Sequence, residues 1–399
     1  MKTREVKLGE VANVKGGKRI PKGIGLINIP NGHPYIRVRD LNNKRVLELD
    51  NSYEYVDNET QKVISKYTVK TGDVVLSIVG TIGLVAIVGR TLDGANLTEN
   101  CVKLSSFHGV NRDFLYYYLR SDCGQQEIRC GTVGAVQAKL PIKNIQNIAI
   151  NLPDYTTQER IASLLLSIDR KIELNQKIND NLEQQAVTYF QELYINNANP
   201  MWQIGTISDL GTVVGGSTPS KTKPEYYTNN GIAWITPKDL SINKSKFISH
   251  GENDITELGL KNSSATVMPK GTVLFSSRAP IGYIAIASNE VTTNQGFKSV
   301  VPYLEIGTAF VYFFLKHSLP VIESAASGST FKEISGSAMK NIPAIIPDQS
   351  TLDQFNSFCA PIFAQQKILE DQNYSLAMLR DSLLPKLMSG AIDIASIQL

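Results

Sequence analysis

The chain has 399 residues, of which 42% are hydrophobic and 19% are charged, and its formal net charge is +3. This length suits two domains of ordinary size, and the composition excludes both a disordered chain and a fibrous repeat. The apolar runs are far shorter than the roughly 20 residues that a membrane helix needs. The first residues lack the apolar core of a secretory signal. We therefore expect a globular cytoplasmic protein with no membrane partner.

The basic charge is segregated along the chain. Residues 1–153 hold 21 Lys and Arg against 14 Asp and Glu, and residues 201–347 hold 12 against 10. Residues 154–200 and 348–399 each carry a net negative charge. This pattern is typical of two polyanion-binding domains joined by protein-contacting segments, although an unevenly solvated surface would give it too.

The sequence aligns with itself at a shift of about 199 residues, which indicates an internal duplication. The matched segments are 16–17 with 215–216, 35–41 with 234–240, 72–77 with 271–276, 114–120 with 310–316, and 152–154 with 346–348. The predicted division is into domains at 1–153 and 201–347, each followed by a helical segment at 154–200 and 348–399.

Each domain is predicted to mix α and β structure. The β-branched runs Val74–Val79 and Leu84–Val88 flank a Gly-Thr-Ile-Gly turn, which favours a pair of buried strands. The second half repeats them as Val273–Ser276 and Tyr283–Ala287. The aromatic run Phe114–Arg120 is predicted to be a helix packed on the sheet, rather than a stacking platform for bases.

The two segments that follow the domains are predicted to be long helices that pair with each other. Thr157–Tyr194 contains no Gly or Pro and places apolar residues at heptad positions. Asn175 and Asn179 interrupt that seam, and polar seam residues fix register and orientation. The residues predicted to pair the helices are Ile161, Leu165, Ile168, Ile172 and Leu182 in the first segment and Phe355, Ile362, Leu369, Leu376 and Leu383 in the second. Linker helices packed on their own domains are the alternative.

Two prolines bear on the second helix. Pro361 predicts a kink and Pro385 predicts the helix end. A helix spanning Thr157–Tyr194 would be about 57 Å long, which exceeds one turn of DNA at roughly 34 Å. Paired helices of that length would hold two domains at a fixed spacing.

Loops rich in basic, amide and small residues are the candidates for DNA contacts, because they let the backbone approach phosphates and base edges. In the first half these residues are Lys18, Arg19, Lys22, Arg39, Ser77, Thr81, Asn100, Thr132 and Lys139. In the second half they are Ser217, Thr218, Ser220, Lys221, Lys238, Ser276, Ser277, Arg278, Asn294, Gln295, Thr330 and Lys332. Solvated turns and turn caps are the alternative interpretation of the same residues.

The sequence offers no candidate catalytic or metal-binding residues. It lacks the Asp/Asn-Pro-Pro-aromatic tetrapeptide that would hold a flipped adenine. The segment Gly215–Lys221 is not a P-loop, because no Gly-Lys-Ser/Thr triplet follows it. The four cysteines form no CxxC pair and show no zinc spacing with the four histidines. We therefore predict a chain without catalytic residues, bound cofactor or metal, whose thiols are reduced and structural.

The combination of motifs resembles the specificity subunits of type I restriction-modification systems. The resemblance is carried by Gly-Gly-Ser-Thr-Pro-Ser-Lys at 215–221, the segments 232–240 and 269–282, Thr-Asn-Gln-Gly-Phe at 293–297, and Leu-Arg-Asp-Ser-Leu-Leu-Pro-Lys-Leu-Met-Ser-Gly at 379–390. It extends over essentially the whole chain. The first domain departs from the pattern, since Lys-Arg-Ile-Pro follows Gly16-Gly17 and Ser-Ile-Val replaces Ser-Ser-Arg at 77–79.

The resemblance implies an α+β protein with two duplicated target-recognition domains and two helices that pair as an antiparallel coiled coil. It implies that each domain reads one half of a bipartite double-stranded DNA site. It also implies two modification (methyltransferase) subunits docked on the helices and restriction (translocase and endonuclease) subunits, with S-adenosylmethionine, ATP and Mg on those partners. A duplicated protein-interaction scaffold and a fused modification enzyme are the alternative functions.

Overall fold

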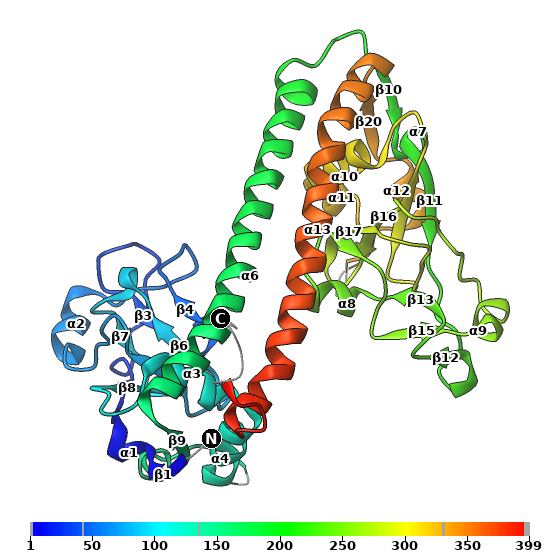
Figure 1. Cartoon of the computed structure of the whole chain (residues 1–399). Helices are drawn as coiled ribbons and strands as arrows, with labels where there is room; N and C mark the ends of the chain where they lie inside the picture. The colour runs from blue at the N-terminus through cyan, green and yellow to red at the C-terminus, as the bar shows by residue number, and fades with distance from the viewer. Residues whose placement is uncertain (1–2, 42–43, 135, 329–331, 395–399) are drawn as a thin grey trace. The chain divides into compact units, whose positions relative to one another are not determined.

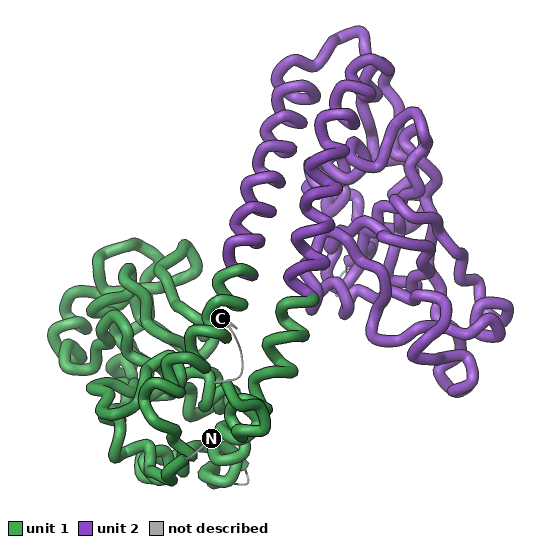
Figure 2. Tube along the Cα trace, in the orientation of Figure 1, with its two compact units in different colours: residues 1–171, 375–399 green, residues 172–374 purple. Residues whose placement is uncertain are grey.

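The structure, a computed structural model, describes residues 3–41, 44–134, 136–328 and 332–394. The chain divides into two compact units (Figure 2). The first unit comprises Met1–Lys171 and Ser375–Leu399, and the second comprises Ile172–Tyr374. Each unit thus combines one mixed α/β domain with one part of each long helix.

A five-stranded sheet forms the centre of the first unit (Figure 1). In order across the sheet, its strands are β2 (Asn13–Gly16), β8 (Cys101–Ser105), β5 (Val74–Ser77), β6 (Val85–Val88) and β4 (Val46–Leu47). Neighbours are antiparallel except β4, which runs parallel to β6. Every residue of β5 and β6 is buried, and alternate residues face two separate apolar cores. The predicted hairpin of buried strands is confirmed.

The remaining elements of the first unit cover this sheet. Two small sheets pair β1 (Thr3–Lys7) with β9 (Ala149–Pro153) and β3 (Tyr35–Ile36) with β7 (Asn96–Leu97). The helices are α1 (Leu8–Val11), α2 (Asn58–Ile64), α3 (Arg112–Arg120), α4 (Asp122–Gly131) and α5 (Ile142–Gln146), with single 3-10 turns at Val38–Asp40 and Arg90–Leu92. Helix α3 confirms the helix predicted at Phe114–Arg120, and its aromatic residues are buried in the core.

The second unit repeats this sheet strand for strand. Its order is β11 (Gly211–Gly215), β19 (Lys298–Pro302), β16 (Val273–Ser277), β17 (Ile281–Ala287) and β14 (Phe247–Ile248). Again only the last strand, β14, is parallel to its neighbour. Because both order and direction match the first unit, the duplication seen in the sequence is a duplication of fold.

Smaller elements complete the second unit. One sheet has the order β12 (Tyr227–Thr228), β15 (Asn253–Ile255), β13 (Ile232–Ile235), β18 (Thr292–Thr293), and another pairs β10 (Gln203–Thr206) with β20 (Pro343–Ile346). The helices are α7 (Ile207–Leu210), α8 (Pro237–Ile242), α9 (Glu257–Lys261), α10 (Thr308–His317), α11 (Leu319–Ser324) and α12 (Gly336–Lys340), with a 3-10 turn at Pro224–Tyr226. Helix α10 corresponds to α3 and is equally buried.

Two long helices follow the domains, α6 (Tyr155–Phe190) and α13 (Gln349–Met388). A π-helical turn, Gln191–Asn196, extends α6. Matched aspartates cap both helices, since Asp154 accepts from the Thr157 amide at 3.0 Å and Asp348 accepts from the Thr351 amide at 2.9 Å. Neither helix is apolar enough over a sufficient length to cross a membrane, and the same holds for every other helix of the described residues.

The helix end predicted near Pro385 is confirmed, although the proline itself lies inside the helix. Helix α13 passes through Pro361 and Pro385 and ends at Met388. Proline removes one backbone donor inside a helix but leaves the carbonyl of its own residue available. The Ser389 amide donates to the Pro385 carbonyl at 3.0 Å, so the last turn closes beyond the proline.

Polar contacts join α6 to α13 within each unit. In the first unit, Arg380 Nη1 lies 2.9 Å from Asp169 Oδ1. In the second, Asn175 is fully buried and its Nδ2 donates to Asn373 Oδ1 at 2.9 Å. The predicted role of Asn175 in fixing the register is consistent with this burial, because a buried amide accepts few alternative partners.

The predicted pairing residues do not form a seam between helices alone. In the first unit, Ile161 and Leu165 are buried in the core that includes α3, and Leu383 packs against that core. In the second, Phe355 and Ile362 belong to the core that includes α10, with Leu182 packed against it. Ile168 and Leu369 are buried, whereas Ile172 and Leu376 are half-buried. Much of each apolar stripe is therefore used to hold a helix on a domain, as the alternative interpretation required.

A buried lysine ties the second domain to both helices of its unit. Lys246 forms an ion pair with Glu183 of α6 and donates to Gln366 Oε1 of α13 at 2.6 Å. Its Nζ also lies 4.1 Å from the centroid of the Phe363 ring. Lys316 of α10 pairs with the same Glu183 at 2.6 Å. Burial lowers the pKa of Lys246, and the Glu183 carboxylate opposes that shift.

Candidate nucleic-acid interface

The first unit has a hollow of about 680 Å³. Four residues predicted to contact DNA line it: Arg19, Lys22, Arg39 and Asn100. Tyr35, Arg37, Thr98 and Glu99, which were not predicted, line it as well. The structure therefore gathers candidates that lie up to 81 positions apart into one concave surface, whose charged residues are mainly cations.

Several cations at this hollow are held by carboxylates. Arg39 Nη2 lies 2.6 Å from Glu54 Oε2, and Arg19 Nε lies 3.4 Å from Glu99 Oε1. Arg19 remains 82% exposed. The Lys18 ammonium lies 5.6 Å from the centroid of the Tyr67 ring. Because these contacts orient the side chains without enclosing them, the cations stay accessible to a polyanion.

A buried aspartate shapes the floor beside the hollow. Asp40 Oδ2 accepts from the Arg37 amide at 2.7 Å, and burial raises the pKa of Asp40 to about 6 despite the nearby Arg39. The second unit repeats the bond, with Asp239 Oδ2 accepting from the Thr236 amide at 2.7 Å. The aspartate thus closes the same turn in both domains.

In the second unit, the predicted loop after Gly215 packs on the loop after β18. The Thr218 hydroxyl donates to Gln295 Oε1, and Trp234 Nε1 donates to the Ser217 carbonyl at 3.0 Å. Ser220 and Lys221 are exposed beyond these anchors. The base of the loop is therefore held by hydrogen bonds, while Ser220 and Lys221 at its tip are exposed.

The two loops are built in the same way. Tyr35 Oη donates to the Lys18 carbonyl at 2.8 Å, as Trp234 does to Ser217. A β-carbon at Gly17 would lie 2.1 Å from the Thr98 oxygen, and one at Gly216 would lie 1.9 Å from the Asn294 oxygen. Only glycine allows this approach, which explains the second glycine of the Gly-Gly pair in both halves.

Three predicted contacts are wrong. Ser77, Ser276 and Ser277 are fully buried, so they cannot reach DNA in this fold. The Ser77 hydroxyl donates to the Thr81 carbonyl at 2.6 Å, and Ser276 donates to the Pro280 carbonyl at 2.8 Å. Both serines hold the turn between the paired strands, which was the alternative interpretation. Thr81 itself is exposed at that turn.

Two further candidates have structural bonds. The Thr132 hydroxyl donates to the Ile128 carbonyl at 2.8 Å at the end of α4, and Asn294 Oδ1 accepts from the Gly296 amide at 2.9 Å. Lys238 Nζ is paired with Glu252 at 2.6 Å but remains exposed. The turns in which Thr132 and Asn294 take part account for these two residues. Lys238 occupies the position in the second unit that Arg39 occupies in the first.

A second matched position distinguishes the units. An isolated β-bridge joins Val79 to Lys139 in the first unit and Arg278 to Glu333 in the second. Arg278 Nη1 lies 3.2 Å from Glu333 Oε2, and Lys298 lies 3.8 Å from the same carboxylate. Lys332 is exposed beside Glu333, and Thr330 lies outside the described residues. The equivalent bridge thus joins an Arg and a Glu that form an ion pair in the second unit, but a Val and a Lys in the first.

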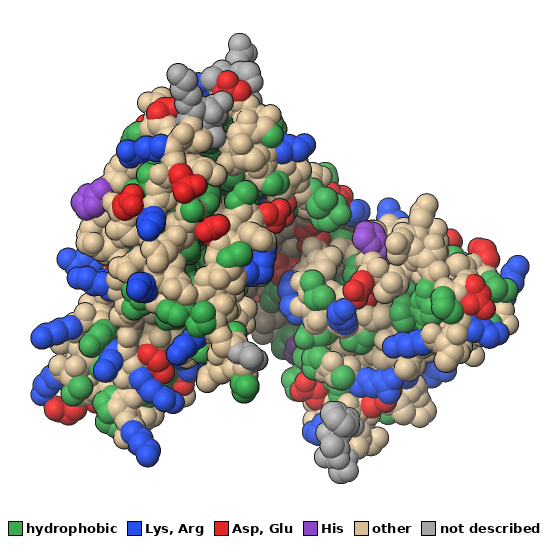
Figure 3. Space-filling view, turned by 90° about the horizontal axis from the view of Figure 1, so that it is seen from below, with side chains coloured by type: hydrophobic (Ala, Val, Ile, Leu, Met, Phe, Trp, Pro, Cys, Tyr) green, Lys and Arg blue, Asp and Glu red, His purple; other side chains and the backbone are tan. Residues whose placement is uncertain are grey.

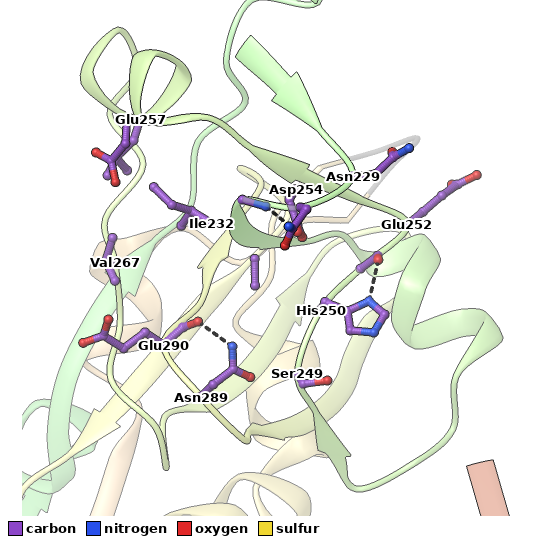
Figure 4. A pocket seen from close by; sticks show the side chains of 15 residues that line it. Asn229, Ile232, Ser249, His250, Glu252, Asp254, Glu257, Val267, Asn289 and Glu290 are labelled. Carbon is purple, nitrogen blue, oxygen red and sulfur yellow. Dashed lines mark hydrogen bonds between the residues drawn. The ribbon is translucent and has the colours of Figure 1, made fainter. Parts of the chain in front are cut away.

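A larger hollow of about 930 Å³ in the second unit is a poor place for a polyanion. Glu252, Asp254, Glu257 and Glu290 line it together with His250 (Figure 4). Asp254 Oδ2 accepts from the Gly231 amide at 3.0 Å. Because carboxylates dominate its walls, phosphate would be repelled there.

Charged side chains of both signs are interspersed on the face drawn in Figure 3. The candidate interface is defined by the matched loops of the two domains. Sequence reasoning missed Glu99, Glu54 and Glu333, because their positions beside cations depend on the tertiary fold.

Comparison with known proteins identifies the family. The model of the type I restriction modification DNA specificity domain matches residues 2–184 and again 199–372. The chain therefore belongs to the type I restriction-modification DNA specificity family. It contains two such domains, and the predicted resemblance and fold class are confirmed.

Similarity to individual members varies along the chain. Over 192 residues it is 40% identical to the MjaIX specificity subunit of Methanocaldococcus jannaschii, covering 46% of this chain and 44% of that protein. Over 341 residues it is 23% identical to the HindI specificity subunit of Haemophilus influenzae, covering 67% and 73%. A crystal structure of a type I restriction-modification S subunit from M. genitalium shares the fold, with a TM-score of 0.58 at 16% identity over 97% of this chain and 99% of that chain.

Proposed function

We propose that this chain is the DNA-recognition subunit of a type I restriction-modification complex, in which each domain reads one half of a bipartite double-stranded site. The observation that carries the proposal is the matched pair of glycine loops. Both loops are anchored by an aromatic side chain, Tyr35 or Trp234, and both present polar or cationic side chains beside a second loop. Two domains of the same fold that carry different side chains at their loop tips suit a DNA site with two different halves.

The chemistry of the complex is assigned to partner subunits. The printed sequence lacks the tetrapeptide that adenine methyltransferases use, and it lacks a P-loop. We therefore assign S-adenosylmethionine to two modification subunits, and ATP and Mg to restriction subunits. This chain would act without a catalytic centre, by binding DNA and holding the enzymes on it.

The long helices are the proposed docking surface for the modification subunits. On the second unit's part of these helices, Leu174, Ile178 and Tyr374 are exposed although they are large and apolar. Met378 and Leu379 are exposed on the first unit's part of α13. Exposed apolar residues on a helix are typical of a protein–protein interface.

The test is sequencing-based mapping of adenine methylation in cells that express this chain with its neighbouring modification subunit. Cells with the modification subunit alone are the control. The proposal predicts a new bipartite motif only when both proteins are present. Methylation that does not depend on this chain would contradict the proposal and favour a protein-binding scaffold.

A further inference from the structure

One side chain in each unit is positioned by the glycine loop at the edge of the candidate interface. In the first unit it is Glu99, whose Oε1 lies 3.4 Å from Arg19 and whose Oε2 accepts from the Thr98 hydroxyl at 3.0 Å. In the second unit it is Gln295, whose Oε1 accepts from the Thr218 hydroxyl. Both side chains are thus held from the same side by the glycine loop.

Backbone hydrogen bonds show that Glu99 and Gln295 occupy the same place in the fold. The Lys18 amide donates to the Leu97 carbonyl at 2.8 Å, and the Ser217 amide donates to the Thr293 carbonyl at 2.9 Å. One residue further on, the amides of Thr98 and Asn294 each donate at 3.0 Å, to the carbonyls of Ile36 and Ile235 respectively. The next residue in each unit is Glu99 or Gln295. By the same match, the predicted contact Asn100 takes the place of Gly296.

The carboxylate of Glu99 indicates which groups of DNA this position is suited to contact. Glu99 lines a hollow that also contains Arg19, Lys22 and Arg39, and its side chain is 35% exposed. A carboxylate repels phosphate, so Glu99 is unsuited to a contact with the DNA backbone. It is suited to accept from the exocyclic amino group of cytosine, whereas a glutamine amide suits the donor and acceptor pair of adenine.

We propose that Glu99 and Gln295 are specificity-determining residues at matched positions, Glu99 selecting cytosine in one half-site and Gln295 selecting adenine in the other. The inference rests on the proposed function, because it requires that the matched loops face DNA bases. Arg19 and Thr218 act as positioning residues, since each fixes an oxygen of the side chain that reads the base.

The test exchanges the two side chains one at a time and maps methylation in cells that also hold the modification subunit. Glu99→Gln keeps an acceptor for Arg19 and should shift one position of the first half-site from cytosine towards adenine. Gln295→Glu should make the opposite shift in the second half-site. Each preference should change by about tenfold or more, and the other half of the motif should stay as in the wild type.

Glu59→Gln is the matched control, because Glu59 is exposed on α2 and pairs with Lys62 at 2.7 Å away from the hollow. It should leave both half-sites unchanged. Competition binding by the purified assembly, using duplexes that differ only at the affected base, provides the second measurement. There each variant should prefer its new base even if methylation is slow.

The outcomes separate this inference from the proposed function. A wild-type motif that both variants retain unchanged overturns this inference alone. Uniformly weaker binding to all duplexes, with no change in base preference, also overturns it and leaves Glu99 and Gln295 as structural residues. A wild-type chain that directs no motif overturns the proposed function, and this inference with it.

Discussion

The two recognition domains share their strand order and the hydrogen bonds that shape their loops, and they differ in the side chains at the loop tips. Strand order, the buried turn serines Ser77 and Ser276, and the aspartates Asp40 and Asp239 are repeated in detail. The side chains at the loop tips are not repeated, as Glu99 against Gln295 shows. The comparison teaches that a duplicated fold preserves the bonds that shape its loops while the residues at the loop tips diverge.

A second matched position carries a cation in both units. The Ile286 amide donates to the Lys246 carbonyl at 2.7 Å, and the Ile87 amide donates to the Arg45 carbonyl at 2.8 Å, so Lys246 and Arg45 are equivalent. Lys246 pairs with Glu183 of α6, whereas Arg45 forms an ion pair at 3.1 Å with Asp113 of α3. Each cation is thus paired with a carboxylate on a helix of its own unit.

The largest expected effect comes from matched core substitutions, which test whether the two units open independently. Leu76 and Phe275 occupy matched positions in β5 and β16, and both are buried. Phe275→Ala should destabilise the second unit by about 3–5 kcal/mol, and Leu76→Ala should destabilise the first by about 2–5 kcal/mol, because each leaves a cavity. Hydrogen exchange resolved by peptide should show faster opening only in the unit that carries the substitution. Equal opening of both units would contradict the separation of the chain into two units.

Breaking the ion pair between Lys246 and Glu183 should destabilise the second unit by a comparable amount, and the second unit only. Glu183→Ala leaves Lys246 buried without its carboxylate and should cost about 3 kcal/mol. Thermal unfolding would report the loss, and Glu183→Gln should recover part of it because its amide oxygen still accepts from Lys246. A loss below about 1 kcal/mol for Glu183→Ala would show that Gln366 alone satisfies the lysine.

The buried aspartate predicts a pH dependence. The pKa of Asp40 is raised to about 6 by burial, so the folded state favours the protonated acid. Stability from this group is present below the unfolded pKa near 4 and is lost as the pH rises through about 6. Relative to Asp40→Asn, the wild type should lose up to about 3 kcal/mol of unfolding free energy between pH 4 and 7.

Urea unfolding at several pH values measures this difference, and Asp57→Asn is the control of opposite sign. Hydrogen bonds from the Thr60 amide and hydroxyl lower the pKa of the helix-capping Asp57. Its contribution to stability is therefore present above the unfolded pKa and lost as the pH falls through the lowered folded pKa. A pH-independent difference between the wild type and Asp40→Asn would contradict the assignment.

The smallest expected effect concerns one exposed cation. Lys221→Ala should reduce the slope of log affinity against log salt by about 1, if Lys221 contacts one phosphate. The base motif should not change. Lys270→Ala, which removes the same charge from an exposed turn of the second unit, is the matched control. Equal effects of the two substitutions would show general electrostatic attraction in place of a specific contact.

Local patterns in the sequence predicted much of the fold. The hairpin strands, α3 and α6 follow from apolar patterns that act over a few residues, and α6 also from the absence of Gly and Pro. The serines were misassigned because a strand buried on both faces gives no alternation that would show which side chains point inward. Glu99 was missed because its partner, Arg19, lies 80 positions away in the sequence. Contacts of that kind are set by tertiary packing alone.

The most direct test of the central claim replaces residues 1–153 with a second copy of residues 201–347 and maps the methylated motif. If each domain reads its own half-site, the motif should become one whose two halves carry the same bases, with the second half as in the wild type. A motif that still contains the original first half would contradict the account, because recognition would then not lie in the exchanged domain.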